Sequence, residues 1–148
     1  MLLCFEYLHN GSLQRYITEG SCGLEWHTRY QIIKGICQGL GYLHENSIIH
    51  LDLKPENILL DANMVPKIAD YAYARLLSED RRTAPENFAT SLDYMAPEYY
   101  EDGVISVKSD IYSLGIIIMQ IVTGQKDHAN TKSVLGGWSR LESDRIHH

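Results

Sequence analysis

The sequence contains few cysteines, and their positions exclude two classes of protein. Its 148 residues include three cysteines, Cys4, Cys22 and Cys37, and no two of them form a CxxC pair. An odd number without such spacing argues against a disulfide framework and against a thiolate zinc site. We therefore expect reduced thiols, as in a cytosolic protein.

The sequence also lacks runs of basic residues and long apolar segments. With a net charge of −6 and no stripe of lysine or arginine, it does not fit a nucleic-acid-binding protein. The longest apolar run, 111–122, is interrupted by Ser113 and Gln120 and is too short to cross a bilayer. No signal-peptide pattern follows Met1. We expect a chain with no membrane anchor of its own, and its 45% hydrophobic content is enough to form a core.

Two long helical patterns are present. The first is predicted over about 25–44, with Asn46 suited to ending it, because apolar residues recur at steps of three and four. The buried stripe predicted for this helix consists of Trp26, Tyr30, Ile33, Cys37 and Leu40. The second helix is predicted from Val107 to Thr123, where Gly124 stops it.

Shorter elements are predicted around these helices. In chain order they are a strand at 2–5, a turn at 10–11, a short helix capped by Ser12 and running to about Thr18, and a hairpin of 58–60 with 65–68. Residues 73–95 are polar and weakly periodic, so we expect them to be mobile.

Three short motifs occur in a fixed order: HLDLKPEN at 50–57, DYA at 70–72 and APE at 96–98. The loop residue Asp52 is suited to accept the proton of an attacking hydroxyl, and Lys54 to neutralise charge on a phosphoryl group. Asn57 and Asp70 carry hard oxygen atoms that suit Mg²⁺. A lone aspartate or lysine is usually a solvated loop residue. Four such residues within three ordered motifs indicate a phosphoryl-transfer site instead.

These motifs resemble those of the eukaryotic protein kinase domain, and specifically of the plant receptor-like kinases. The segments 5–13, 30–44 and 109–115 resemble, in turn, the hinge, the helix before the catalytic loop and the central buried helix of that family. The resemblance covers 1–142 as a partial kinase domain and leaves 143–148 as an unassigned tail. It implies an α+β fold, here the mainly α-helical large lobe with the small lobe largely missing.

The resemblance also implies an activity and a location. It points to a serine/threonine protein kinase that uses ATP and Mg²⁺ and acts on a protein substrate. The parent receptor would be anchored in the plasma membrane, with this region cytoplasmic, at the cytosolic face.

The family's residue roles carry over by position. Asp52 matches the catalytic aspartate, Lys54 the lysine typical of serine/threonine specificity, and Asn57 and Asp70 the magnesium ligands. The remaining matches are Phe5 at the gatekeeper, Glu6 and Leu8 as adenine-contacting backbone, Ser91 on the substrate side, Glu98 as the activation-segment anchor and Asp110 as the anchor beneath the catalytic loop.

The sequence departs from the family pattern at several positions. Leu51 replaces an arginine, as in the non-RD kinases, and leucine cannot bind an activation-loop phosphate. We therefore expect that phosphorylation of Ser78, Thr83 or Thr90 would not order the segment by that route. Ala72 replaces a glycine and has less backbone freedom, and Asp93 stands where the family often has glycine.

The sequence contains no G-x-G-x-x-G loop and no strand lysine of the V-A-I-K type. Without those parts we expect negligible kinase activity from the isolated chain, and exposed apolar surface along 111–122. Three interpretations stay open: a catalytic-region fragment of a receptor-like kinase, a truncated or pseudokinase binding module without catalysis, and a partial product without function.

Overall fold

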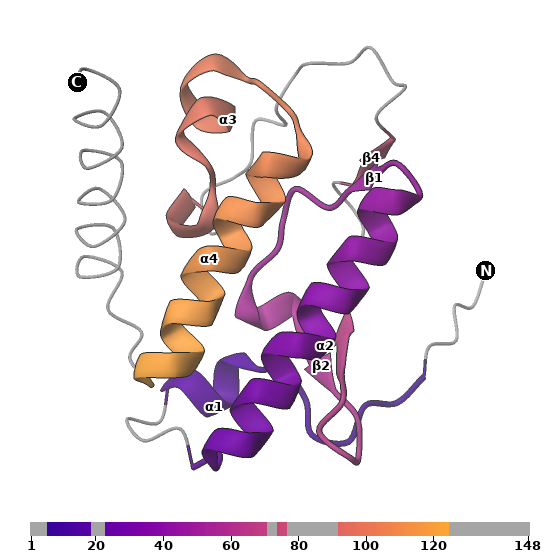
Figure 1. Ribbon diagram of the computed structural model, residues 1–148, viewed down its shortest axis with the longest axis vertical. Coiled ribbons are helices and arrows are strands. Elements are labelled where there is room, and N and C mark those ends of the chain that lie inside the picture. Colours follow the sequence, from indigo (N-terminus) through magenta and orange to yellow (C-terminus); the bar gives the residue numbers. More distant parts are fainter. Residues whose placement is uncertain (1–5, 19–22, 71–73, 77–91, 125–148) are drawn as a thin grey trace, which may run out of the picture.

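The computed structural model describes residues 6–18, 23–70, 74–76 and 92–124 (Figure 1). The helices are α1 (Gln14–Thr18), α2 (Trp26–Glu45), α3 (Pro97–Asp102) and α4 (Val107–Thr123), with 3-10 turns η1 (Pro55–Asn57) and η2 (Leu92–Tyr94). The strands are β1 (Ile48–Ile49), β2 (Ile58–Leu60), β3 (Pro66–Ile68) and β4 (Arg75–Leu76). The described part is therefore mainly helical, with short strands.

Helix α4 confirms the prediction at both ends. The side chain of Ser106 accepts a hydrogen bond from the backbone of Lys108, and Ser109 completes a capping box. At the other end Gly124 adopts the left-handed conformation, with φ +67°, which a glycine tolerates without steric cost. The side chains at the ends of the apolar run, Ile111 and Val122, are 45% and 44% exposed, in line with the expected apolar surface.

Helix α2 also forms as predicted, but the predicted buried stripe is wrong in part. Trp26 and Tyr30 are 61% and 53% exposed, and Cys37 is exposed as well. The residues of α2 that are buried are Ile32, Ile36, Leu40 and Leu43. Two neighbouring rows of apolar residues on α2 have the same helical spacing. Only the row that faces α4 and the hairpin is buried, because those elements cover it.

The main core lies where α2 contacts both α4 and the hairpin of β2 and β3 (Figure 1). Its fully buried members include Ile36 of α2, Ile58 of β2 and Ile117 of α4. The hairpin lies very close to α2, because a Cβ atom on Gly35 would be 2.5 Å from Cγ of Pro66. Only glycine fits at that contact.

The hairpin is confirmed, with β2 and β3 antiparallel and Ile58 opposite Ile68. The short helix α1 begins at Gln14, later than expected, because the backbone around Ser12 pairs with the hairpin. Ser12 forms a β-bridge with Leu59, and the Leu13 amide donates to the Ile58 carbonyl at 2.8 Å.

Strand β4 was not predicted. It pairs antiparallel with β1, with Ile49 opposite Arg75. A pair of two-residue strands is too short to leave a periodic pattern. The predicted strand at 2–5, and residues 77–91 of the segment that we expected to be mobile, lie outside the described residues.

Candidate active site

The structure brings Asp52, Lys54 and Asn57 together in the loop that joins β1 to β2. The Lys54 ammonium lies 2.9 Å from Oδ2 of Asp52. The amide nitrogen of Asn57 donates to the same oxygen at 2.9 Å and to the Asp52 carbonyl at 2.9 Å. The Asp52 side chain is almost fully buried, so these contacts hold its carboxylate in one orientation.

Asp70 reaches this region because the hairpin returns the chain to Asn57. The amide of Ala69 donates to the Asn57 carbonyl at 2.8 Å, and Asp70 follows with φ +62° and an exposed side chain. The two bonds from the Asn57 amide nitrogen leave its amide oxygen for another ligand. An amide oxygen and a carboxylate are hard donors that fit Mg²⁺, which takes few protein ligands and completes its shell with phosphate and water.

Among the described residues, no group of three or more histidine, cysteine or acidic side chains is suited to hold a metal ion.

His50 is a site residue to which the sequence assigned no role. Its ring is fully buried, with Nε2 3.0 Å from the Ala69 carbonyl and Nδ1 accepting from the Asp52 amide at 3.3 Å. These two bonds together fit a neutral ring that carries its proton on Nε2. His50 therefore joins the backbone of Asp52 to the end of the hairpin that precedes Asp70. Its place at the start of the first motif was the only signal in the sequence.

Asp110 of α4 binds the backbone of the same loop, which confirms its expected role as the residue that anchors the loop. Its Oδ2 accepts from the His50 amide at 2.9 Å, and its Oδ1 accepts from the Leu51 amide at 2.8 Å. Nε2 of His44, near the end of α2, lies 2.8 Å from Oδ2 of Asp110. A single carboxylate with no exposed surface thus ties both helices to the loop that carries Asp52.

Leu51 has a packing role that the sequence did not reveal. Its φ is +66°, an uncommon left-handed conformation that the two bonds to Asp110 help to maintain. The side chain is buried in a second apolar cluster that consists of Ile49, Leu51, Ala96 and Tyr99. A charged side chain buried at this position would need a partner of opposite charge. Leucine needs none and packs the loop directly against the start of α3.

The segment before α3 is fastened to α4 by two side chains. The Ser113 hydroxyl donates to the Tyr94 carbonyl at 2.6 Å, and the Tyr94 hydroxyl donates to the Gln120 amide oxygen at 3.1 Å. Burial raises the pKa of Tyr94 to about 12. The hydrogen bond with Gln120 acts against this rise, and the negative charges of Glu56 and Asp93 add to it. Burial also raises the pKa of Tyr112.

The family model of the protein kinase domain matches residues 1–141. The chain belongs to the protein kinase family. The described helices and short strands are the mainly helical part of the kinase fold.

Curated relatives narrow this assignment. The chain is similar to the Arabidopsis thaliana G-type lectin S-receptor-like serine/threonine-protein kinase SRK, with 45% identity over 85% of this chain and 16% of that protein. It is also 45% identical to Cysteine-rich receptor-like protein kinase 2 of the same plant, over 93% of this chain and 22% of the relative. The chain thus spans about a fifth of the length of these receptor-like kinases.

Several residues that the kinase resemblance singled out remain predictions. Phe5, Ser91, Tyr71, Ala72 and the three candidate phosphorylation sites lie outside the described residues. The carboxylate of Glu6 is exposed and lies 3.3 Å from Lys67, and Leu8 is half-buried. Asp93 is exposed in η2. Among the described helices, none is long and apolar enough to span a membrane.

Proposed function

We propose that this chain forms the catalytic part of a serine/threonine protein kinase that transfers the γ-phosphoryl group of ATP to a protein hydroxyl. The observation that carries the proposal is the buried carboxylate of Asp52, held at 2.9 Å by both Lys54 and Asn57. Phosphoryl transfer needs positioning and electrostatic stabilisation rather than covalent participation of the protein. A fixed carboxylate beside a fixed ammonium supplies both.

In this proposal Asp52 orients the substrate hydroxyl and accepts its proton as the oxygen attacks phosphorus. Lys54, beside that carboxylate, stabilises negative charge on the transferring phosphoryl group. His50 and Asp110 act by position, because they fix the backbone on which Asp52 stands.

Asn57, through its amide oxygen, and Asp70 would hold Mg²⁺, which when bound neutralises charge on the phosphates of ATP. The hairpin supports this pairing because it places residue 69 against Asn57. Phe5, Glu6 and Leu8 would line the adenine side, and Ser91 would lie on the substrate side, as the family pattern implies.

The relatives support a finer assignment. They are receptor-like protein kinases by name, so we propose a protein substrate and a location at the cytosolic face of the plasma membrane within a larger receptor.

A chimera tests the proposed activity. The aligned segment of Cysteine-rich receptor-like protein kinase 2 is replaced by this chain, and incorporation of labelled phosphate into a protein substrate is measured. We expect activity, and we expect Asp52→Asn to lower kcat by about 10²–10⁴-fold, because general-base catalysis contributes that much.

Asp102→Asn is the matched control, since Asp102 is exposed on α3 and away from the loop. It should leave kcat unchanged. A folded chimera without activity would favour the binding-module interpretation, and an Asp52→Asn variant of full activity would contradict the role of Asp52.

A further inference from the structure

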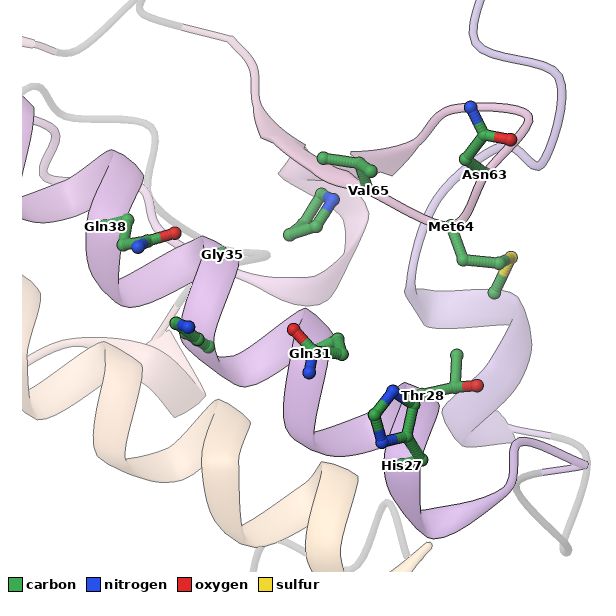
Figure 2. Close-up of a pocket in the computed structure, with 10 residues that line it drawn as sticks. His27, Thr28, Gln31, Gly35, Gln38, Asn63, Met64 and Val65 are labelled. Atoms are coloured by element: carbon green, nitrogen blue, oxygen red, sulfur yellow. The ribbon is translucent and has the colours of Figure 1, made fainter.

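A groove of about 460 Å³ lies between α2 and the turn that joins β2 to β3 (Figure 2). It contains none of the residues of the candidate active site. The lining consists of His27, Thr28, Gln31, Lys34, Gly35, Gln38, Asn63, Met64, Val65 and Pro66. We call it the α2–turn groove.

The helix wall of the α2–turn groove is long and straight. His27, Gln31, Lys34 and Gln38 follow one another at steps of three and four and therefore share a face of α2. From residue 27 to residue 38 the helix rises about 16 Å at 1.5 Å per residue. That length matches about five residues of an extended chain at roughly 3.3 Å each.

The opposite wall is a fixed turn. Oδ1 of Asp61 accepts hydrogen bonds from the amides of Asn63 and Val65, at 2.8 and 2.9 Å. Met64 between them has φ +63°, and in Figure 2 its side chain points across the gap toward Thr28. The close contact of Gly35 with Pro66 closes the floor. Both walls are therefore in place before any ligand arrives.

The polar groups of the groove fit a peptide main chain. Gln31, Gln38 and Asn63 each carry both a donor and an acceptor, which is the pair that an extended backbone presents. In the part of the chain that the structure describes, the side chains of Gln31, Lys34 and Gln38 make no hydrogen bond or ion pair. Their hydrogen-bonding groups are available.

The charge of the groove selects an acidic ligand. Lys34 contributes an ammonium group, and none of the ten lining residues carries a carboxylate, although the whole chain has a net charge of −6. The carboxylate of neighbouring Asp61 is engaged by the turn itself. Asp61 keeps its negative charge but lies outside the lining, so an anionic side chain in the groove would meet the Lys34 ammonium with no carboxylate among the lining residues.

We propose that the α2–turn groove docks an extended acidic peptide segment of a partner protein. One acidic side chain pairs with Lys34, and the main chain bonds to Gln31 and Gln38. An apolar side chain of the peptide packs on the wall formed by Met64, Val65 and Pro66. The proposal does not depend on catalysis, because no residue of the groove belongs to the active site.

Fluorescence anisotropy with the full 148-residue chain tests the proposal. The ligand is a labelled, capped hexapeptide of alternating glutamate and valine, and its counterpart has lysine in place of glutamate. We expect saturable binding of the acidic peptide alone. Lys34→Glu should weaken it by about tenfold, since the variant replaces an attractive charge with a repulsive one, and should improve binding of the lysine peptide.

Lys108→Glu is the matched control, because Lys108 is also exposed but lies on α4 outside the groove. An equal loss in both variants would mean nonspecific attraction and would overturn the proposal. If Lys34→Glu does not fold, as judged by circular dichroism, Gln38→Ala replaces it, with an expected loss of about threefold.

Amide chemical shifts of the unmodified chain give an independent readout. Peptide-dependent shifts confined to 27–38 and 63–66 support the site, and shifts elsewhere overturn it. Full displacement of the peptide by millimolar inorganic phosphate would instead assign the groove to a small anion, and an absence of any binding would also overturn the proposal.

Discussion

The two ends of helix α2 show opposite uses of polar residues. At the C-terminal end His44 contacts Asp110, whose carboxylate also holds the amides of His50 and Leu51. At the N-terminal end Trp26 and Tyr30 are exposed, and Lys34 projects into an open groove. Groups at the first end satisfy one another. Nearer the N-terminus Arg29 also donates to the backbone of α4, whereas Lys34 makes no hydrogen bond or ion pair among the described residues and is available to other molecules.

The difference lies in what each group would lose if its contacts changed. A buried carboxylate that accepts three hydrogen bonds has one favourable arrangement, because loss of any bond leaves a buried polar group unsatisfied. Leu51 reinforces the arrangement by packing into the second apolar cluster. The exposed side chains of α2 carry no such penalty, so they can exchange water for a ligand.

Removal of Asp110 should have the largest effect. Asp110→Ala leaves the His50 and Leu51 amides and the His44 ring without their acceptor inside the protein. We expect the free energy of unfolding to fall by about 3–5 kcal/mol, as for other broken buried ionic contacts. Urea titration followed by circular dichroism measures this change.

Asp102→Ala is the control for the loss of an acidic residue, because Asp102 is exposed on α3. Its effect should stay within about 0.5 kcal/mol. Equal effects of the two substitutions would show that the buried end of α2 is no more constrained than the surface.

The sequence predicted the buried end better than the exposed end, and the reason is physical. The loop around Asp52 and its anchor Asp110 were predicted from the kinase resemblance, and the bounds of α4 from its apolar run and from Gly124, which ends the helix. The buried stripe of α2 was wrong in part because adjacent apolar rows have the same periodicity, and only tertiary contacts select Ile32 and Ile36 over Trp26 and Tyr30.

Contacts between residues far apart in the chain could not be predicted from the sequence, for a related reason. Strand β4 exists through its partner β1, and the ring of His50 is held by Ala69, nineteen positions away. Neither interaction has a local pattern. The α2–turn groove likewise joins residues from two elements whose separate patterns carry no sign of a shared cavity.

A smaller effect is expected at the buried hydroxyl of Tyr94, which donates a hydrogen bond to Gln120. Tyr94→Phe removes the hydroxyl that bonds Gln120, whose amide nitrogen is already buried without a partner in the described structure. The free energy of unfolding should fall by about 1–3 kcal/mol. Adding Gln120→Leu should restore part of it, because replacement of both partners removes the unsatisfied groups. A double variant less stable than Tyr94→Phe would contradict this account.

The raised pKa of Tyr94 leads us to expect that the free energy of unfolding falls at alkaline pH. The folded chain holds the Tyr94 proton more tightly than the unfolded chain, because burial raises its pKa from 10.0 to about 12. Its contribution is therefore complete below about pH 10 and declines as the pH rises toward 12. Urea midpoints measured across this range should fall more steeply in the unmodified chain than in Tyr94→Phe. Parallel curves would contradict the assignment.

The smallest effect is expected at the exposed end of α2. Trp26→Gln should change the free energy of unfolding by no more than about 0.5 kcal/mol, because the indole is 61% exposed and lies outside the core. Ile36 lies on the buried side of the same helix and has no exposed surface. Ile36→Ala should therefore lower the free energy of unfolding by about 2–5 kcal/mol. Urea titration of both variants decides between the two stripes. A costly Trp26→Gln with a mild Ile36→Ala would restore the stripe predicted from periodicity and would place the core of this kinase chain on the other face of α2.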